Sequence, residues 1–344
     1  MNWALLLSAG LCSMLISGLW LRCVRHRLVD VPGARSLHRQ PTPTGGGIGV
    51  SAGMALLPLL APVWGLSVFS GMDATPLLVA TLVLSLVGLL DDLRGLPVGL
   101  RLVLQGMCAA WVLSSMGVVP QAAPVVGAAV WVLGLLWLVG FTNVFNFMDG
   151  IDGLAASQAV FVGFASAFLA MRAGAGADLP LLLALAGASS AGFLCWNWPP
   201  ARLFMGDAGS LPLGFMLAAL GLGCVLRGLL SIWCLLILWA PFLGYAGVTL
   251  LLRTLRGAAI LRPHREHAYQ RLATALGAHR AVTLGVLAVD LCWLLPLALL
   301  AEGRTEFAPI TALVALAPLL AGVVVVSLRL PADGAAGEVP ARTD

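Results

Sequence analysis

The sequence predicts an all-α polytopic membrane protein, and three observations carry that prediction. The 344-residue chain is 60% hydrophobic and 10% charged, with a mean hydropathy of +1.00, so it has too little polar surface to cover a water-soluble globule. Apolar runs long enough to cross a bilayer recur along its whole length. Its seven cysteines stand singly, without the spacing of a zinc site or a disulfide framework, and are interpreted as packing residues.

About eleven transmembrane helices are expected, because a spanning helix needs about 20 mostly apolar residues. The candidates are residues 4–21, 47–67, 76–90, 100–118, 124–141, 154–171, 180–197, 210–226, 229–252, 282–300 and 308–328. The first run lacks the basic residues that precede the core of a signal peptide, so it is expected to remain as a span. Residues 1–330 are predicted to form a single transmembrane domain, and residues 331–344 a disordered cytoplasmic tail.

The positive charges predict the orientation of these spans. All 19 basic residues are arginines, and placing the N-terminus outside and the C-terminus in the cytoplasm leaves only Arg172, Arg227 and Arg304 on the outer side, as the positive-inside rule favours. The same alternation places five aspartates together on the cytoplasmic side: Asp91, Asp92, Asp149, Asp152 and Asp207. A functional site is therefore expected at the cytoplasmic membrane surface.

The segment GLLDDLRGLPVGLR, residues 88–101, ends an apolar run with two adjacent carboxylates. Asp91 and Asp92 repel each other, so burying them requires a shared cation, either a divalent metal or Arg94. A solvated helix end is the alternative interpretation of this pair.

The segment NVFNFMDGIDGLA, residues 143–155, carries a more specific pattern. Asn146, Asp149 and Asp152 are spaced by three, which predicts that their side chains lie along one side of a helical turn. Oxygen ligands at this spacing suit a hard cation such as Mg²⁺. Gly150 and Gly153 allow a ligand or another backbone to approach closely.

Two further segments add polar groups on the same side. Asp207 stands just before a span, where it is placed to cap the helix. A helix N-terminus also binds phosphate through its backbone N–H groups, and the two roles do not exclude each other. His264 and His267 lie in the most basic loop, and no cysteine or third histidine nearby completes a zinc site. A site for an anion or a sugar is the better interpretation of this loop.

Acidic groups suited to Mg²⁺, with arginines at the inner membrane surface, indicate a site that handles phosphates. Phosphoryl transfer needs mainly positioning and charge neutralisation, which metals and cationic side chains provide. A site half in lipid indicates that one substrate is itself a lipid. A transporter is the alternative from another class, but it would place charges near the middle of its spans and often shows inverted repeats.

The sequence resembles the polyprenyl-phosphate N-acetylhexosamine-1-phosphate transferases of glycosyltransferase family 4. The matching segments are PTPTGGG, GLLDDLRG, NVFNFMDGIDGLA, FMGDAGSLPLG and PHREHAYQRL, in the family's order. The histidine segment is most similar to the branch that initiates O-antigen synthesis. The phospho-N-acetylmuramoyl-pentapeptide transferases share these motifs and are the alternative within the class, although their histidine loop is normally a denser run.

The resemblance implies transfer of an N-acetylaminosugar 1-phosphate from a UDP-sugar to undecaprenyl phosphate, releasing UMP and initiating O-antigen or another surface polysaccharide. It places the protein in the bacterial inner membrane with its active site on the cytoplasmic face. Mg²⁺ is the expected cofactor, with Mn²⁺ as an alternative. No nucleic acid is expected as a partner, and the donor sugar and a homodimer are left open.

The resemblance also implies roles for individual residues. Asn146 and Asp207 would hold the metal, and Asp91 or Asp92 would meet the lipid phosphate. Asp149 and Asp152 would contact the nucleotide or shape the site. The substrate-binding set comprises Arg39, Thr44, Arg94, Arg101, Asn143, His264, Arg265 and His267. Two positions depart from the family, since Gly95 replaces a third acid found in some relatives and Thr44 replaces a frequent arginine.

Chemistry limits the role of the adjacent acids. A phosphate monoester has a second pKa of about 6, so the lipid phosphate is already largely dianionic near neutral pH. Asp91 and Asp92 are therefore expected to act through metal or phosphate geometry and not by removing a proton. Sugar choice is expected to lie in the loop over residues 253–281.

Overall fold

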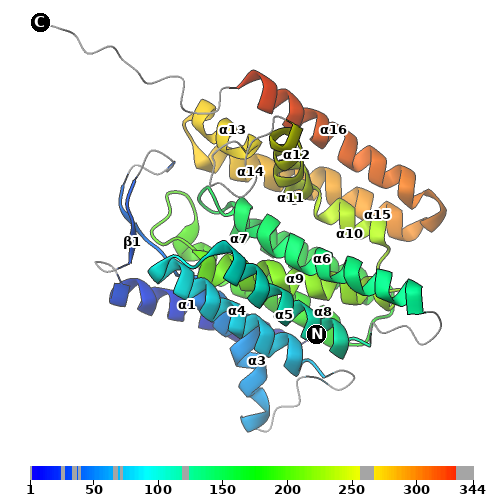
Figure 1. The fold of residues 1–344 in the computed structure, drawn as a ribbon, viewed down its shortest axis with the longest axis horizontal. Helices are drawn as coiled ribbons and strands as arrows, with labels where there is room; N and C mark the ends of the chain where they lie inside the picture. Colours follow the sequence, from blue (N-terminus) through cyan, green and yellow to red (C-terminus); the bar gives the residue numbers. More distant parts are fainter. Residues whose placement is uncertain are drawn as a thin grey trace, which may run out of the picture.

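A computed structural model of the chain describes residues 2–24, 28–32, 37, 40–64, 69, 73–117, 124–255 and 267–330. These residues are almost entirely helical, as the sequence predicts (Figure 1). Within the described ranges, nine helices are long and apolar enough to cross a membrane, and a bent helix pair adds a tenth candidate. The chain is therefore a multi-pass membrane protein.

The described residues form long helices joined by shorter helical elements and one pair of short strands. The uninterrupted long helices are α1 (Trp3–Val24), α4 (Thr75–Arg94), α5 (Val98–Ser115), α6 (Pro124–Met148), α7 (Leu154–Arg172), α8 (Asp178–Asn197), α9 (Asp207–Leu226) and α16 (Ala308–Arg329). One further span consists of α14 (His279–Val289), the π-helix η4 (Asp290–Leu294) and α15 (Leu295–Gly303). The shorter elements are α2 (Ile48–Ser51), η1 (Ala52–Leu56), α3 (Leu57–Leu60), η2 (Ala61–Trp64), α10 (Ile232–Leu238), α11 (Ala240–Phe242), η3 (Leu243–Gly247), α12 (Val248–Leu255), α13 (Ala268–Leu276) and η5 (Thr305–Phe307). Strands β1 (Val29–Asp30) and β2 (Thr42–Pro43) pair antiparallel, with Val29 opposite Pro43.

Several of the expected spans differ from the structure, and the one expected at 124–141 continues as α6 to Met148. The run at 47–67 forms a shorter apolar helix that ends at Val63, and the span expected at 76–90 continues to Arg94. The span expected at 229–252 is broken after α10, where the helix axis bends by 67°. Pro241 lies in the first turn after this break and has no backbone N–H to continue the hydrogen-bond ladder. The prediction of eleven straight spans therefore missed this bend.

Glycines bring two pairs of helices into backbone contact. A Cβ atom on Gly192 of α8 would lie 2.0 Å from the carbonyl oxygen of Gly10 on α1. A Cβ atom on Gly88 of α4 would lie 2.0 Å from the carbonyl oxygen of Asp207 on α9. Close approach at small residues is the usual packing mode of helices in membranes, where burial of apolar surface alone drives little association. The second contact fixes α4 against the first turn of α9.

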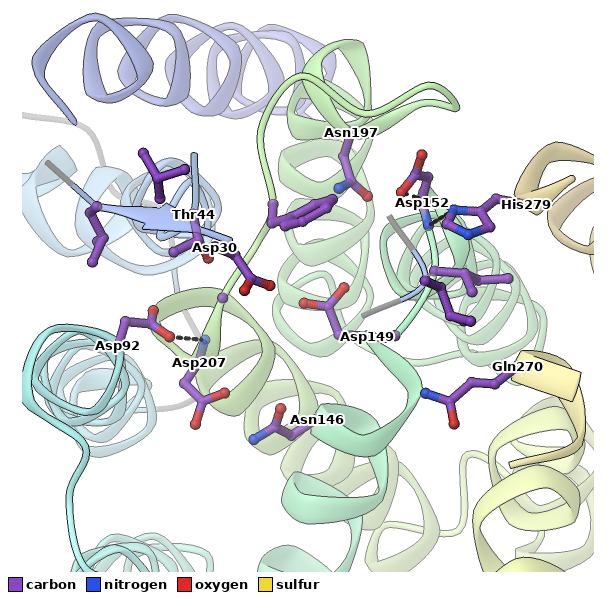
Figure 2. A pocket seen from close by; sticks show the side chains of 17 residues that line it. Asp30, Thr44, Asp92, Asn146, Asp149, Asp152, Asn197, Asp207, Gln270 and His279 are labelled. Atoms are coloured by element: carbon purple, nitrogen blue, oxygen red, sulfur yellow. Dashed lines mark hydrogen bonds and ion pairs between the residues drawn. The ribbon is translucent and has the colours of Figure 1, made fainter. Parts of the chain in front are cut away.

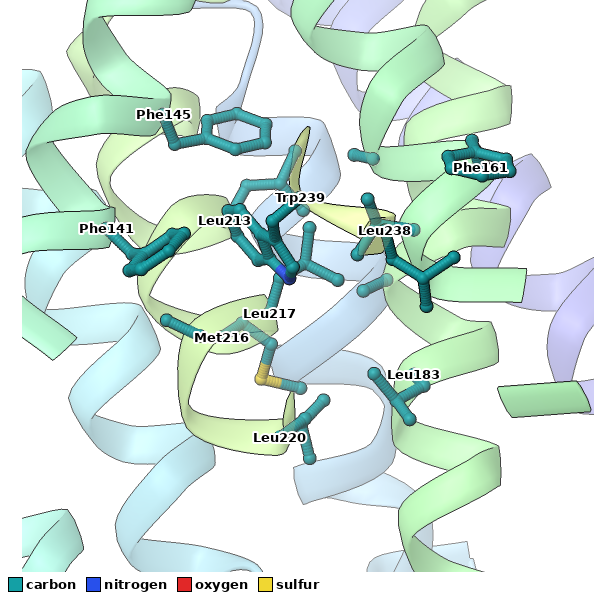
Figure 3. Packing of buried hydrophobic residues seen from close by; sticks show 14 of the residues in the cluster. Phe141, Phe145, Phe161, Leu183, Leu213, Met216, Leu217, Leu220, Leu238 and Trp239 are labelled. Carbon is teal, nitrogen blue, oxygen red and sulfur yellow. The ribbon is translucent and has the colours of Figure 1, made fainter. Parts of the chain in front are cut away.

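An aromatic cluster packs the broken span against the centre of the bundle (Figure 3). The ring of Phe145 on α6 stacks on Phe242 of α11 with centroids 5.0 Å apart. Phe141 meets the edge of Trp239 at 4.6 Å. Dense packing of these large side chains holds α6 rigidly. Because Asn146 lies in the last turn of α6, its position is fixed as well.

One end of the bundle gathers the helix termini that the sequence predicts to share a membrane face. Helices α4, α6 and α8 end there, and α7, α9 and α14 begin there. The β1–β2 hairpin and α13 lie at this end, on the left in Figure 1. The backbone N–H of Phe204 donates to the carbonyl of Pro43 at 2.8 Å and ties the hairpin to the segment before α9.

Candidate active site

A polar cavity of about 480 Å³ opens at this end of the bundle. Figure 2 shows its polar side chains converging from strands, helix ends and connecting segments far apart in the sequence. They are Asp30, Thr44, Asp92, Asn146, Asp149, Asp152, Asn197, Asp207, Gln270 and His279. The cavity thus brings together six of the residues singled out in the sequence: Thr44, Asp92, Asn146, Asp149, Asp152 and Asp207.

Asp92 supplies the N-terminal cap of α9 from another helix. Its carboxylate accepts hydrogen bonds from the backbone N–H groups of Asp207 and Ala208, at 3.0 and 3.1 Å. The N-cap residue of α9, Gly206, has no side chain that could cap the helix. Because Asp92 occupies the helix terminus, the carboxylate of Asp207 is left to face the cavity.

Gly206 makes this arrangement possible at the start of α9. Its φ of +69° lies in the left-handed region, which favours glycine. A Cβ atom at this position would lie 2.5 Å from the carboxylate of Asp92 and 2.9 Å from the hydroxyl of Thr44. The glycine therefore allows both side chains to approach the first turn of α9.

Arg101 of α5 links two of the predicted acids. Its guanidinium bonds the carboxylate of Asp91 and lies 2.8 Å from Oδ2 of Asp207. Asp91 also accepts a hydrogen bond from the backbone N–H of Leu96 at 2.5 Å. Asp91 does not line the cavity itself, and it contacts the site through Arg101 and through the neighbouring carboxylate of Asp207.

Asn146 lies in the last turn of α6 whereas Asp149 and Asp152 follow the helix, so the prediction that one helical turn carries all three side chains is wrong. Helix α6 stops at Met148, and residues 149–153 form a turn that returns the chain into α7. Gly153, with φ +75°, ends this turn. All three polar side chains nevertheless line the same cavity, because the turn folds across its floor.

Asp149 carries the least compensated charge in the cavity. Among the described residues, no hydrogen bond or ion pair reaches its carboxylate. Burial, together with the negative charges of Asp92 and Asp152, raises the pKa of Asp149 to about 7. A cation or a hydrogen-bond donor brought by a ligand would stabilise its ionised form.

Asp152 is held by contacts on both carboxylate oxygens. Oδ1 lies 3.1 Å from Nδ1 of His279, and Oδ2 accepts a hydrogen bond from the backbone N–H of Ala201 at 3.0 Å. The hydroxyl of Thr283 donates to the backbone carbonyl of Asp152 at 2.9 Å. These contacts lock the start of α14 onto the turn before α7.

Two amide side chains complete the wall of the cavity. Asn197 accepts a hydrogen bond from the backbone N–H of Gly153 and donates one to the carbonyl of Leu203, both at 3.0 Å. The oxygen of Asn146 accepts from the hydroxyl of Ser210 at 3.2 Å. The amide oxygen of Asn146 and the carboxylate of Asp207 thus come from facing helices, as two donors to one cation would.

Three predicted substrate-binding residues lie away from the cavity. Arg94 is exposed at the end of α4, and Asn143 donates to the buried side chain of Gln105 at 2.6 Å. His267 is 3% exposed, and its Nδ1 lies 3.3 Å from the carbonyl of Tyr245. Their predicted roles stay predictions. The remaining members of the set, Arg39, His264 and Arg265, lie outside the described residues.

The cavity is strongly acidic. Five carboxylates line it, and the basic side chains described next to them are the guanidinium of Arg101, beside Asp207, and the imidazole of His279, beside Asp152. Within the described ranges, no three His, Cys, Asp or Glu side chains are grouped as a complete metal site. This donor set suits Mg²⁺, which is commonly held by one or two carboxylates plus substrate phosphates. Asn146 and Asp207 offer only oxygen atoms, which suit Mg²⁺ better than zinc.

Comparison with known proteins gives the family. The sequence profile of glycosyl transferase family 4 matches residues 74–225. A probable undecaprenyl-phosphate N-acetylglucosaminyl 1-phosphate transferase of Bacillus subtilis is 30% identical over 266 residues, which cover 74% of this chain and 72% of that protein. The chain belongs to glycosyl transferase family 4.

Two further members of this family extend the comparison. A decaprenyl-phosphate N-acetylglucosaminephosphotransferase of Mycolicibacterium smegmatis is 31% identical over 316 residues, covering 81% of this chain and 77% of that protein. A phospho-N-acetylmuramoyl-pentapeptide-transferase of Moorella thermoacetica is 38% identical over 216 residues, covering 55% and 63%. The profile of the family spans α4 to α9, the helices that carry Asp92, Asn146 and Asp207.

Sequence reasoning missed four polar residues of the cavity: Asp30, Asn197, Gln270 and His279. Asp30 and Asn197 stand alone in their segments and carry no spacing signal. Gln270 lies in the matching segment PHREHAYQRL and His279 follows it, and that proximity was the one available clue. Their place in the cavity depends on α13 and α14 folding back over the turn at residues 149–153.

Proposed function

We propose that this chain transfers an N-acetylaminosugar 1-phosphate from a UDP-sugar to undecaprenyl phosphate, forming undecaprenyl-diphosphate sugar and UMP. The observation that carries the proposal is the convergence of Asp92, Asn146, Asp149, Asp152 and Asp207 on one cavity at the bundle end. These residues come from three separate segments of the sequence, and the family relatives that match most of the chain are named for this reaction type.

The proposed reaction is a phosphoryl transfer. An oxygen of the lipid phosphate forms a bond to the β-phosphorus of the UDP-sugar, and the bond from that phosphorus to the bridging oxygen breaks. UMP leaves with the bridging oxygen. Because such transfers depend mainly on positioning and charge neutralisation, the site needs no strong nucleophile of its own.

The acidic side chains have two distinct tasks in this proposal. Asp207 and Asn146 would hold Mg²⁺ through oxygen atoms, with Mn²⁺ as an alternative. When bound, the metal neutralises charge on the diphosphate. Asp92 and Asp91 act indirectly, since Asp92 fixes the first turn of α9 and Asp91 fixes Arg101 beside Asp207. This division agrees with the expectation that neither acid removes a proton.

The other face of the cavity would receive the sugar nucleotide. Asp152 is already held rigidly by His279 and the backbone of Ala201. Asp149 lies between that wall and the proposed metal site (Figure 2). Thr44 closes the cavity beside Gly206. A rigid wall next to a cation site would align the diphosphate for attack.

The membrane arrangement follows from the proposal. The excess of arginine on one side supports an N-terminus outside, a C-terminus in the cytoplasm and a cavity on the cytoplasmic face of the bacterial inner membrane. UDP-sugars are charged and soluble, so a donor would reach the cavity from the cytoplasm. The lipid acceptor would reach it from the bilayer.

A pentapeptide transferase of peptidoglycan synthesis is the second candidate. The observation that favours it is the 38% identity to the Moorella thermoacetica protein. That match covers 55% of the chain, whereas the two N-acetylglucosamine-1-phosphate transferases cover 74% and 81%. An O-antigen role for the product rests on the histidine segment alone.

A donor panel separates these candidates. Purified protein in detergent is given undecaprenyl phosphate, Mg²⁺ and one donor at a time, and the lipid product is identified by mass spectrometry. The proposal expects an undecaprenyl-diphosphate N-acetylaminosugar from a UDP-N-acetylated monosaccharide. Product only from UDP-N-acetylmuramoyl-pentapeptide would assign the chain to the second candidate. A protein that forms no lipid product with any donor would contradict both.

A further inference from the structure

Gln270 differs from the other two amides of the cavity. Both groups of Asn197 bond to backbone atoms, and the oxygen of Asn146 accepts from Ser210. The buried Oε1 of Gln270 has no hydrogen-bond partner. It is the one such side-chain atom among the described residues that line this cavity. Leaving a buried amide oxygen unpaired destabilises a fold, so this oxygen is available to accept a hydrogen bond from a bound ligand.

The position of Gln270 is fixed by its neighbours. The hydroxyl of Tyr269 donates to the backbone carbonyl of Phe147 at 2.7 Å, which fastens α13 to the end of α6. A Cβ atom on Gly150 would lie 2.8 Å from Nε2 of Gln270 and 2.3 Å from the hydroxyl of Tyr269. The amide of Gln270 therefore packs directly against the turn that carries Asp149, and the glycine leaves it room.

The two side chains are chemically complementary. Figure 2 shows the amide nitrogen of Gln270 directed toward the side of the cavity where Asp149 lies. Gln270 offers N–H donors, and the carboxylate of Asp149, which no described residue bonds, offers acceptors. A ligand group between them would meet a donor on one side and an acceptor on the other.

We propose that Gln270 and Asp149 together bind a group of the sugar nucleotide that carries both a hydrogen-bond donor and an acceptor, namely an amide or a hydroxyl. The N–H of Gln270 donates to the oxygen of that group, and the unpaired Oε1 of Gln270 and the carboxylate of Asp149 accept from its N–H or O–H groups. This inference rests on the proposed function. Two parts of the donor have this chemistry: the acetamido and hydroxyl groups of the sugar, and the uracil ring.

Gln270 lies outside the segment that the family profile matches, residues 74–225. It belongs to the region, residues 253–281, in which the sequence predicts sugar choice. A neutral amide in this place recognises a ligand by hydrogen-bond geometry and adds no charge to the acidic cavity. Sites built on hydrogen bonds discriminate strongly against analogues that lack the bonded group.

The substitution Gln270→Met tests the proposal, because methionine matches the length of glutamine without its amide. The KM for the UDP-sugar is expected to rise about tenfold, as loss of a hydrogen bond of ordinary strength requires. The KM for undecaprenyl phosphate is expected to stay the same. The melting temperature should not fall, since the variant removes an unpaired buried oxygen. Thr274→Met, on the exposed side of the same helix, is the control and should leave both KM values unchanged.

Binding measurements distinguish the two parts of the donor. Calorimetric titration of wild-type protein and Gln270→Met with UMP and with a UDP-N-acetylaminosugar compares the two ligands directly. Weaker binding of the UDP-sugar alone supports contact with the sugar, and equally weaker binding of UMP supports contact with uracil. Unchanged binding and KM would overturn the proposal, and so would a lower melting temperature with unchanged binding. Wild-type protein that binds these ligands without turnover would contradict the proposed function and still leave this comparison valid.

Discussion

The carboxylate of Asp92 lies at the N-terminus of the helix that begins with Asp207, and it accepts the first two backbone N–H groups of that helix. A residue from α4 therefore supplies the cap that α9 lacks in its own sequence. Adjacent acids at a membrane boundary repel each other, but here each has a different partner, because Asp91 pairs with Arg101. Asp91 and Asp92 together therefore hold Asp207 and the guanidinium of Arg101 in place.

Loss of this cap should destabilise the protein. Asp92→Ala is expected to lower the free energy of unfolding by about 1–2 kcal/mol, the usual contribution of a helix cap, and to reduce activity by displacing Asp207. Asp207→Ala should abolish activity with a smaller change in stability, because Asp92 and not Asp207 supplies the cap of α9. Thermal unfolding in detergent compares the two variants. Equal melting temperatures for wild-type protein and Asp92→Ala would refute the capping role.

The contact between α4 and α9 leaves no room for a side chain. Gly88→Ala is expected to lower stability and activity together, since its Cβ would meet the backbone carbonyl of Asp207 at 2.0 Å. Gly106→Ala is the matched control on α5, where no atom lies within 4 Å of the added Cβ. The control should gain roughly 0.5–1 kcal/mol from reduced backbone freedom. Melting temperatures that shift equally in both variants would show that the contact is unimportant.

The protonation of Asp149 should appear as a pH dependence of stability. Its pKa of about 7 in the folded protein lies above the ordinary value of 3.8, so folding retains a proton that the unfolded chain releases. Stability from this group is complete below about pH 4 and is lost as the pH rises through about 7. Asp149→Asn removes this loss. With a chelator present, the variant should therefore melt well above wild-type protein at pH 8 and show a smaller advantage at pH 5. An equal difference at the two pH values would contradict this account.

His279 and Asp152 should act as one unit. His279→Ala is expected to raise the KM for the UDP-sugar about tenfold, because it frees the carboxylate that His279 holds at 3.1 Å. The double variant His279→Ala/Asp152→Ala should be little worse than Asp152→Ala alone, as expected for two residues in one network. The measurement is steady-state kinetics of wild-type protein, the two single variants and the double variant. Strictly additive effects on KM would show that His279 acts independently of Asp152.

Much of the fold follows from sequence pattern. Apolar runs near 20 residues predict the long helices, because a bilayer-crossing backbone must satisfy its own hydrogen bonds. The bend after α10 was missed, since Trp239 and Pro241 stand inside an apolar run of full length. Hydropathy reports how apolar a segment is, and it does not report a change of direction within it.

The candidate site was predictable where the spacing of polar residues along the sequence indicates a shared chemical role. Asn146, Asp149 and Asp152 were expected on one helical face, and they reach one cavity through a turn that Gly153 ends. His279 and Gln270 could not be predicted, because their place depends on α13 and α14 packing across that turn. Residues that work through tertiary contact leave no periodic signal in a single sequence.

The most direct test of the central claim is Mg²⁺-dependent release of UMP from UDP-N-acetylated sugars, measured with undecaprenyl phosphate and with Asp207→Ala as the blank. The account predicts release with at least one sugar, loss of release with a chelator, and no release by Asp207→Ala. A wild-type protein that is pure and folded but releases no UMP from any of these donors would contradict it.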